Sequence, residues 1–222
     1  MQWTDQGYLL SKTNFDENSI IIETFTLEHG KFTGIVYGGA SRKNKKNFQI
    51  GNKLSLNWKS KNQNKSGYFS TELIKPIIPS YFHDKKRCIC ILSAVSILKI
   101  LLPERQVNEK IYNSFELMID KIKSKNWIQF YIFWELSLIK ELGYEIDFLK
   151  DYQKKNNLNI YIKINEKDFK VPEMILKRKM HKDEKNVKEA LAFNKNLLLE
   201  NFIFPNKIKL PLFRKILEMY YS

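Results

Sequence analysis

The distribution of glycine divides this chain into two parts that must fold differently. Seven of the eight glycines lie at or before residue 67, and the remaining one is Gly143. Glycine marks turns and short strands, because it adopts backbone conformations that other residues avoid, and it destabilises helix interiors. We therefore expect an N-terminal part built from short strands and a C-terminal part built mainly from helices.

The glycine-rich part is predicted to contain five strands. The clearest is residues 53–59, where Leu54, Leu56 and Trp58 share one face and polar residues, including two lysines, share the other. A strand with one dry face and one basic face suits a small barrel. Five such strands within residues 1–78 are compatible with an OB-fold, although an SH3-like barrel fits the pattern nearly as well. The predicted strands are residues 6–12, 20–26, 31–37, 53–59 and 67–74.

The remainder, residues 79–222, is predicted to form a mainly helical domain, which makes the chain an α+β protein. Helical periodicity or apolar content predicts helices over much of this part, and the helix that begins with Trp127 is apolar on nearly every side, as in the centre of a bundle. Residues 147–185 show weak periodicity and are expected to be irregular, apart from a possible short strand at 159–164. The predicted helices are residues 86–102, 107–123, 127–142 and 185–200, and a last one that starts at Pro211.

The charge of the chain favours a polyanionic partner. The net charge is +14, but only five of the 38 basic residues are arginine, and compositional drift toward lysine would scatter positive charge over any surface. Residues 41–65 are more informative, because they contain eight basic residues and no acidic one. Such a basic lobe on a small β-structure predicts contacts with a DNA or RNA backbone. The eight residues are Arg42, Lys43, Lys45, Lys46, Lys53, Lys59, Lys61 and Lys65.

Aromatic residues near this basic lobe are candidates for stacking on nucleic-acid bases. Trp58 shares a strand face with leucines and is expected in the core, whereas Tyr37 and Phe48 flank the basic loop. We therefore predict Tyr37 and Phe48 as stacking residues. The full set of aromatic candidates is Phe32, Tyr37, Phe48, Trp58 and Tyr68.

Other classes of function receive no support from the sequence. The three histidines are far apart and none lies beside a nucleophile or a second metal ligand, and no Walker loop, GxSxG or HExxH motif is present. The two cysteines, Cys88 and Cys90, form no CxxC pair and suit a reducing compartment. Neither a signal peptide nor a transmembrane run is recognisable. We expect a cytoplasmic, non-enzymatic protein without a metal, another cofactor or a membrane partner.

Three stretches of this sequence resemble the RecO family of bacterial DNA repair proteins. Residues 7–43 read GYLLSKTNFDENSIIIETFTLEHGKFTGIVYGGASRK, similar to the opening strands of that family. Residues 48–58 contain the pattern F-Q-x-G-N-x-L-x-x-x-W. Residues 131–148 read YIFWELSLIKELGYEIDF, similar to a family helix that ends in Gly-Tyr. The matches cover about a third of the chain, and their spacing extends over most of it.

The resemblance implies an N-terminal OB-fold, a helical C-terminal domain and a nucleoid-associated mediator of DNA recombination. Family members bind single- and double-stranded DNA, anneal complementary strands, and act with RecR to load RecA onto strands coated by single-strand-binding protein (SSB), whose acidic C-terminal tail docks on RecO. The basic loop after Gly38 would face DNA. Many members hold zinc with four cysteines after the Gly-Tyr helix, but residues 147–171 contain no cysteine, so no zinc is expected here.

Two other functions remain open at the level of sequence. An RNA-binding OB protein, such as a ribosome or tRNA accessory factor, would show the same basic lobe. A helical adaptor that binds acidic peptide tails would show the same helices, with its lysines reflecting composition alone.

Overall fold

The computed structural model describes residues 1–61, 67–144, 152–155, 159–178 and 183–221; side chains are described for these residues except 152–155 and 159. Two compact units, Met1–Tyr112 and Asn113–Ser222, make up the chain.

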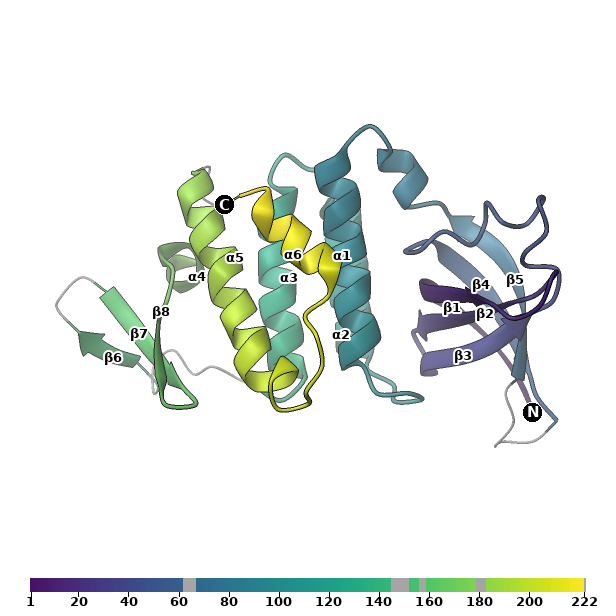
Figure 1. The fold of residues 1–222 in the computed structure, drawn as a ribbon, viewed down its shortest axis with the longest axis horizontal. Coiled ribbons are helices and arrows are strands. Elements are labelled where there is room, and N and C mark those ends of the chain that lie inside the picture. Colours follow the sequence, from purple (N-terminus) through teal and green to yellow (C-terminus); the bar gives the residue numbers. More distant parts are fainter. Residues whose placement is uncertain (62–66, 145–151, 156–158, 179–182, 222) are drawn as a thin grey trace. The chain divides into compact units, whose positions relative to one another are not determined.

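The first unit contains a closed five-stranded barrel with the strand order β1-β2-β3-β5-β4 (Figure 1). β1 pairs with both β2 and β4, and β3 pairs with β5 in parallel. Antiparallel neighbours with one parallel closing pair make the barrel OB-like, as predicted. The strands are β1 (Gln2–Asn14), β2 (Ile20–Thr26), β3 (Gly30–Val36), β4 (Lys53–Lys59) and β5 (Gly67–Lys75).

Strict alternation along β4 places its apolar residues inside the barrel. Leu54, Leu56 and Trp58 are buried, at 0%, 1% and 4% exposed, and the residues between them are half-buried on the outer face. This confirms the predicted core role of Trp58. Burial of each such side chain contributes about 1.5–3 kcal/mol. The same core contains Leu9, Ile20, Ile22, Val36, Phe48 and Phe69.

The first compact unit extends beyond the barrel because helical residues pack on it. A 3₁₀ turn (Ile78–Tyr81) leads into α1 (Lys85–Leu101), where the carboxylate of Asp84 accepts a hydrogen bond from the N–H of Arg87 at 3.0 Å. After α1 the chain runs along β3, where the N–H of Arg105 donates to the carbonyl of Lys31 at 2.8 Å. The predicted domain boundary at residue 78 falls just after the barrel, within this unit, and stays a prediction.

The second unit is built mainly from helices, as expected for the C-terminal part. α2 (Glu109–Lys121) enters this unit, and α3 (Trp127–Glu141), α5 (Glu184–Leu198) and α6 (Leu212–Met219) lie side by side (Figure 1). α3 is the buried centre: residues on all sides of it are buried. Gly143 ends this helix as predicted, with φ at +99° and its N–H donating to the carbonyl of Lys140.

The segment predicted to be irregular contains regular structure. Within residues 147–185, the described part holds an antiparallel sheet of order β6-β7-β8 and the short helix α4 (Glu173–Lys177). β7 (Asn159–Ile164) is the predicted strand, while β6 (Tyr152–Lys155) and β8 (Lys167–Lys170) were not predicted. Both are four residues long, too short for a recognisable alternation. The pairing with β7 stabilises them, and pairing over long distances is invisible to a local pattern.

Candidate nucleic-acid interface

The loop between β3 and β4 folds into a compact turn that displays its basic residues. Gly38 has φ at +71°, a conformation that favours glycine, and its carbonyl accepts hydrogen bonds from the N–H of Ser41 at 3.2 Å and the side-chain amide of Asn44 at 3.0 Å. The N–H of Lys45 then donates to the carbonyl of Ser41 at 2.9 Å. These short-range bonds hold residues 38–47 in place and leave their long side chains outside.

The far end of the loop is anchored in the barrel core. Phe48 is 2% exposed and belongs to the core cluster. Asn52 is fully buried; its side-chain amide donates to the carbonyl of Asn47 at 3.0 Å, and its side-chain oxygen accepts from the N–H of Ile77 at 2.9 Å. The prediction that Phe48 stacks on bases is therefore wrong. Its ring has no accessible face, because it packs in the barrel core and anchors the loop there.

The cations of this loop carry uncompensated charge. Arg42, Lys43, Lys45 and Lys46 are exposed, and within the described part of the chain their side chains make no hydrogen bond or ion pair. The field of the loop reaches Lys12 on β1, whose ammonium donates to the carbonyl of Phe48 at 2.5 Å. Burial, and then repulsion from Lys45, lower the pKa of Lys12. This basic surface therefore attracts anions. It includes Lys12, which the sequence analysis did not identify.

The outer lysines of β4 do not form one cluster. Lys59 lies opposite Tyr68 of β5 in the strand register, at the end of the barrel where β3 also ends. Lys53 lies six residues away, roughly 20 Å along the strand, with its ammonium over the rings of Tyr8 and Tyr112. Lys53 thus packs the barrel against the start of α2, and we leave it out of the candidate interface.

The two remaining predicted lysines lie in the connection between β4 and β5. Lys61 is exposed and follows Lys59 by two residues. Lys65 lies outside the described residues. The candidate interface therefore comprises the basic loop, Lys12, Lys59 and Lys61.

Two exposed tyrosines lie between the basic loop and Lys59. Tyr37 directly follows β3 and is 64% exposed, while Tyr68 on β5 is 40% exposed. Their ring centroids are 6.1 Å apart, with an angle of 51° between the rings. The sequence indicated Tyr37, whereas Tyr68 was a candidate that we did not select. The alternation at the start of β5, where Tyr68 is exposed and Phe69 is buried, was the signal available for it.

The other aromatic residues of the barrel pack against one another. Phe32 is half-buried and makes edge contacts with Trp3 and Trp58, and the guanidinium of Arg105 lies 5.2 Å from the centre of its ring. These rings close one end of the barrel, so we assign them to its stability.

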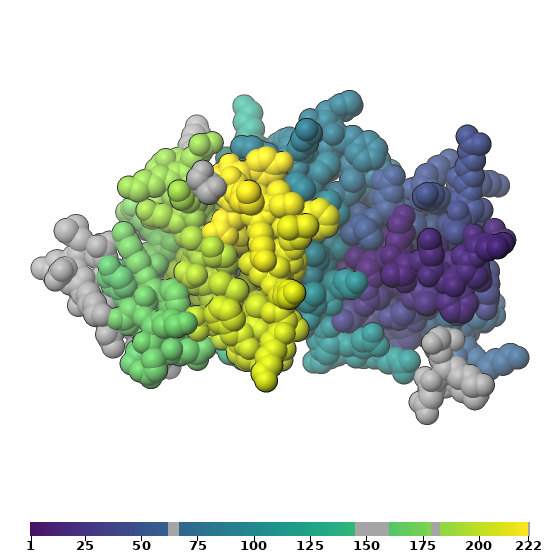
Figure 2. Space-filling view, in the orientation of Figure 1, coloured from purple at the N-terminus to yellow at the C-terminus, as the bar shows by residue number. Residues whose placement is uncertain are grey.

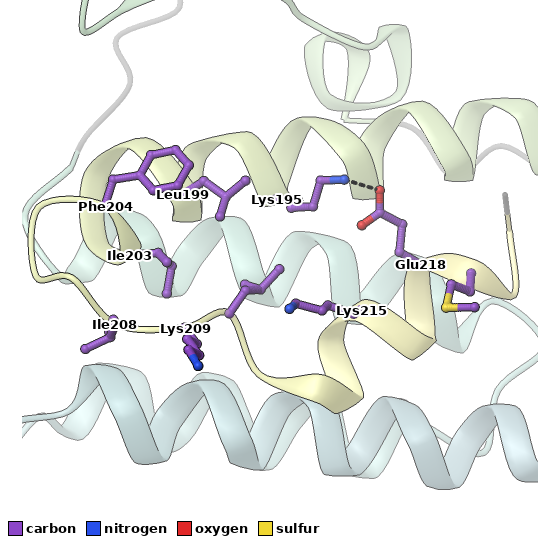
Figure 3. Close-up of a pocket in the computed structure, with 10 residues that line it drawn as sticks. Lys195, Leu199, Ile203, Phe204, Ile208, Lys209, Lys215 and Glu218 are labelled. Atoms are coloured by element: carbon purple, nitrogen blue, oxygen red, sulfur yellow. Dashed lines mark hydrogen bonds and ion pairs between the residues drawn. The ribbon is translucent and has the colours of Figure 1, made fainter.

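A second candidate surface is an apolar groove of about 570 Å³ in the second unit (Figure 3). Its floor comes from the end of α5, from the π-helical turn η2 (Leu199–Ile203) that continues α5, and from α6. π-helical turns are rare and often occur at functional sites. Figure 2 shows α6, in yellow, on the surface of the second unit beside α5. The apolar residues that line the groove are Leu199, Ile203, Phe204, Ile208, Leu210 and Met219.

Charged residues surround this apolar floor. The ammonium of Lys195 pairs with the carboxylate of Glu218 at 2.6 Å across the groove (Figure 3). Lys209 and Lys215 are exposed, and within the described residues their side chains have no acidic partner. The groove therefore combines apolar area with a positive rim, which suits an apolar peptide that carries acidic groups.

A buried ion pair holds the α6 wall of the groove. The guanidinium of Arg214 donates to both carboxylate oxygens of Glu135 on α3, at 2.7 and 3.1 Å, and to the carbonyl of Leu191 at 2.7 Å. Tyr131 donates its hydroxyl to the same carboxylate at 2.9 Å. Burial disfavours the charged form of Arg214, but the Glu135 carboxylate, together with Tyr131 and Glu218, outweighs this and raises the pKa of Arg214, so the guanidinium stays charged.

In residues 1–61, 67–144, 152–155, 159–178 and 183–221, no group of three or more histidine, cysteine or acidic side chains is arranged to hold a metal ion. No helix in this part of the chain is long and apolar enough to cross a membrane. Cys88 and Cys90 are not joined in a disulfide, and burial followed by the charge of Asp84 raises the pKa of Cys88, so this thiol is a poor nucleophile.

Two family models match the chain. The model described as "Recombination protein O N terminal" matches residues 1–77, which include the whole barrel. The model described as "Recombination protein O C terminal" matches residues 83–193, which begin just before α1.

Curated relatives agree with these matches. A DNA repair protein RecO from Wolbachia sp. subsp. Drosophila simulans is 33% identical over 152 residues, covering 68% of this chain and 62% of the relative. The protein of the same name from Cereibacter sphaeroides is 32% identical over 150 residues, covering 68% and 63%. That from Ehrlichia chaffeensis is 33% identical over 162 residues, covering 72% and 66%. The chain thus spans less than two thirds of the length of these relatives.

Proposed function

Since this chain belongs to the RecO family, we propose that it acts in DNA repair and recombination by binding single- and double-stranded DNA and annealing complementary strands. Annealing requires little chemistry from the protein. Two polyanions must approach each other, so a basic surface reduces their repulsion, and base pairing supplies the sequence specificity.

The observation that carries this proposal is the set of free cations on the anchored basic loop. Arg42, Lys43, Lys45 and Lys46 project from a turn that its own hydrogen bonds and a buried ring hold in place. Because the side chains have no acidic partner in the described residues, a phosphate would gain their full attraction without displacing an existing ion pair.

The direct test is a strand-annealing assay with the loop variant Arg42→Ala, Lys43→Ala, Lys45→Ala and Lys46→Ala. We expect slower annealing and weaker binding to single strands. A plot of log affinity against log salt should also become flatter by up to about 3, since each lost phosphate contact removes about 0.7 from the slope. An unchanged slope would contradict the assignment of the loop to DNA.

A matched control removes the same charge from the second unit. Lys123, Lys125, Lys185 and Lys188 are exposed, and changing these four to alanine lowers the net charge equally. This control should bind and anneal nearly as the unmodified protein does.

Competition between single-stranded DNA and RNA of equal length distinguishes DNA repair from an RNA-binding role. A clear preference for RNA would favour the RNA-binding role.

The proposal extends to partners. As the family resemblance implies, the protein would act with RecR to load RecA onto strands coated by SSB. The apolar groove is our proposed docking site for the acidic tail of SSB, because its floor can hold an apolar side chain while Lys209 and Lys215 attract the carboxylates.

Docking of the tail can be measured with a labelled tail peptide and fluorescence anisotropy. Lys209→Glu with Lys215→Glu should weaken peptide binding about 10-fold, because two attractions become repulsions. The same double reversal at Lys123 and Lys125 is the control for net charge. Equal losses in both variants, or equal binding of a tail peptide whose acidic residues are replaced by lysine, would contradict this docking site.

A further inference from the structure

The outer face of the barrel carries a row of side chains that runs across three strands. Tyr68 on β5 lies opposite Ile35 of β3 on one side and opposite Lys59 of β4 on the other. Tyr37 follows Ile35 by two residues, and the centroid of its ring lies 6.1 Å from that of Tyr68. The row therefore places two aromatic rings beside the strand position of Lys59, with the basic loop beginning immediately after Tyr37.

The two tyrosines expose more aromatic surface than the packing of the barrel requires. Tyr37 is 64% and Tyr68 is 40% exposed, whereas Phe69, the neighbour of Tyr68, is 2% exposed. In the described residues neither hydroxyl takes part in a hydrogen bond. A cross-strand aromatic contact alone stabilises a sheet by about 0.2–1 kcal/mol, and that contact would not require the faces of the rings to remain open.

The surroundings of the rings indicate the ligand. An exposed aromatic ring can stack on the face of any nucleobase, and the lysine and loop cations match the phosphates on either side of that base. A base can stack on a protein ring only when it has left its own helix. A duplex, whose bases remain stacked and paired, can reach the cations but not the rings.

We propose that Tyr37 and Tyr68 form a stacking platform for an unpaired base, with Lys59 holding the adjacent phosphate. This inference rests on the proposed function and adds strand selectivity to it. Single strands engage both the rings and the cations, while the annealed product engages the cations alone. The platform thus lets the barrel bind its substrate strands more tightly than its product, which favours release after annealing.

The test compares three DNA probes of equal length: a single strand of about 15 nucleotides, close to the length that an OB-fold covers; the same strand with abasic sites, which keeps its phosphate charge; and the duplex. Each tyrosine should contribute about 10-fold to single-strand affinity, the lower part of the range for base stacking. Tyr37→Ala with Tyr68→Ala should therefore bind the single strand about 100-fold more weakly and the duplex as before. The double variant should also no longer distinguish the normal strand from the abasic one.

Two controls separate stacking from folding. Tyr37→Phe with Tyr68→Phe keeps the rings and should retain the affinity, and Tyr220→Ala removes a tyrosine of similar exposure (38%) from the second unit. A 2-aminopurine base in the single strand reports stacking directly. Its fluorescence should be quenched by the unmodified protein and the phenylalanine variant, but not by the alanine variant.

The outcomes distinguish this inference from the function on which it rests. If the unmodified protein binds the abasic strand as tightly as the normal one, or if the alanine variant loses single-strand and duplex affinity equally, the platform is wrong. The loop variant would still weaken binding in that case, and the proposed function would stand. If the unmodified protein binds none of the three probes, both proposals fail.

Discussion

The basic loop of the barrel and the groove of the second unit use lysine in opposite ways. The loop cations stand free on a polar turn, without apolar surface among them and without an acid in residues 41–65. In the groove, Lys195 is already paired with Glu218, and the free lysines surround an apolar floor. The first arrangement suits a partner that is charged along its whole length, and the second suits a partner that is mainly apolar with a few charges.

The net charge of +14 therefore combines lysines that have two different roles. The loop lysines, which attract a polyanion, have polar surroundings, whereas the groove lysines, which orient a peptide, lie beside apolar side chains. The affinity of the basic loop should depend strongly on salt concentration, whereas the affinity of the groove should depend chiefly on apolar contacts.

The largest effect is expected from breaking the buried ion pair behind the groove. Arg214→Ala leaves the Glu135 carboxylate buried without its partner, and both side chains are 0% exposed. We expect the free energy of unfolding, measured with urea, to fall by about 3–5 kcal/mol. Arg214→Met together with Glu135→Leu removes both charges, and the free energy of unfolding of this double variant should stay close to that of the unmodified protein. A single variant that loses under about 1 kcal/mol would show that the pair does not hold α6.

A nearly equal effect is expected at the anchor of the loop. Phe48→Ala should lower the free energy of unfolding by about 3–4 kcal/mol, because a ring that is 2% exposed leaves a cavity behind. Phe48→Leu keeps an apolar anchor and should cost about 1 kcal/mol, with DNA affinity unchanged. A loss of single-strand affinity in a stable Phe48→Leu protein would restore the stacking role that the structure contradicts.

Salt should separate the two surfaces more directly. The four loop cations alone should make single-strand affinity fall about 50-fold between 50 and 200 mM salt. Binding of the tail peptide to the groove should fall only about 3-fold over the same range, because apolar burial does not depend on ion release. Isothermal titration at both concentrations checks this, and parallel losses would mean that the two surfaces bind by the same physics.

The smallest effect is a change in proton binding at Lys12. Its pKa is lower in the folded chain than the ordinary value of 10.5, through burial and then Lys45. The unfolded chain therefore binds more protons between these two values, and stability rises with pH across that interval. Lys45→Ala should raise the pKa of Lys12 and flatten that rise, as measured by NMR of the lysine side chains. Lys43→Ala serves as the control, and DNA should shift the pKa in the same direction as Lys45→Ala. An unmoved pKa in both experiments would place Lys12 outside the interface.

Much of the fold was predictable because its signals are local. Alternation in residues 53–59 identified β4 and the burial of Trp58, and Gly143 marked the end of α3. Each of these features depends on residues that are close together in the sequence. The cations at Arg42–Lys46 were likewise recognisable, since exposure follows from a polar turn between two strands.

The sequence alone was therefore sufficient to predict the order of the barrel strands and of the main helices, the buried face of β4 and the concentration of charge in one loop. Tertiary contacts were needed to show that Phe48 anchors the loop, that Lys53 packs on rings, and that Tyr37 contacts Tyr68 with Lys59 on the facing strand position. Only the tertiary structure joined Arg214 to Glu135, which are 79 residues apart. The physical reason is that burial and pairing at these positions depend on the register between distant strands and helices, and local periodicity contains no information about that register.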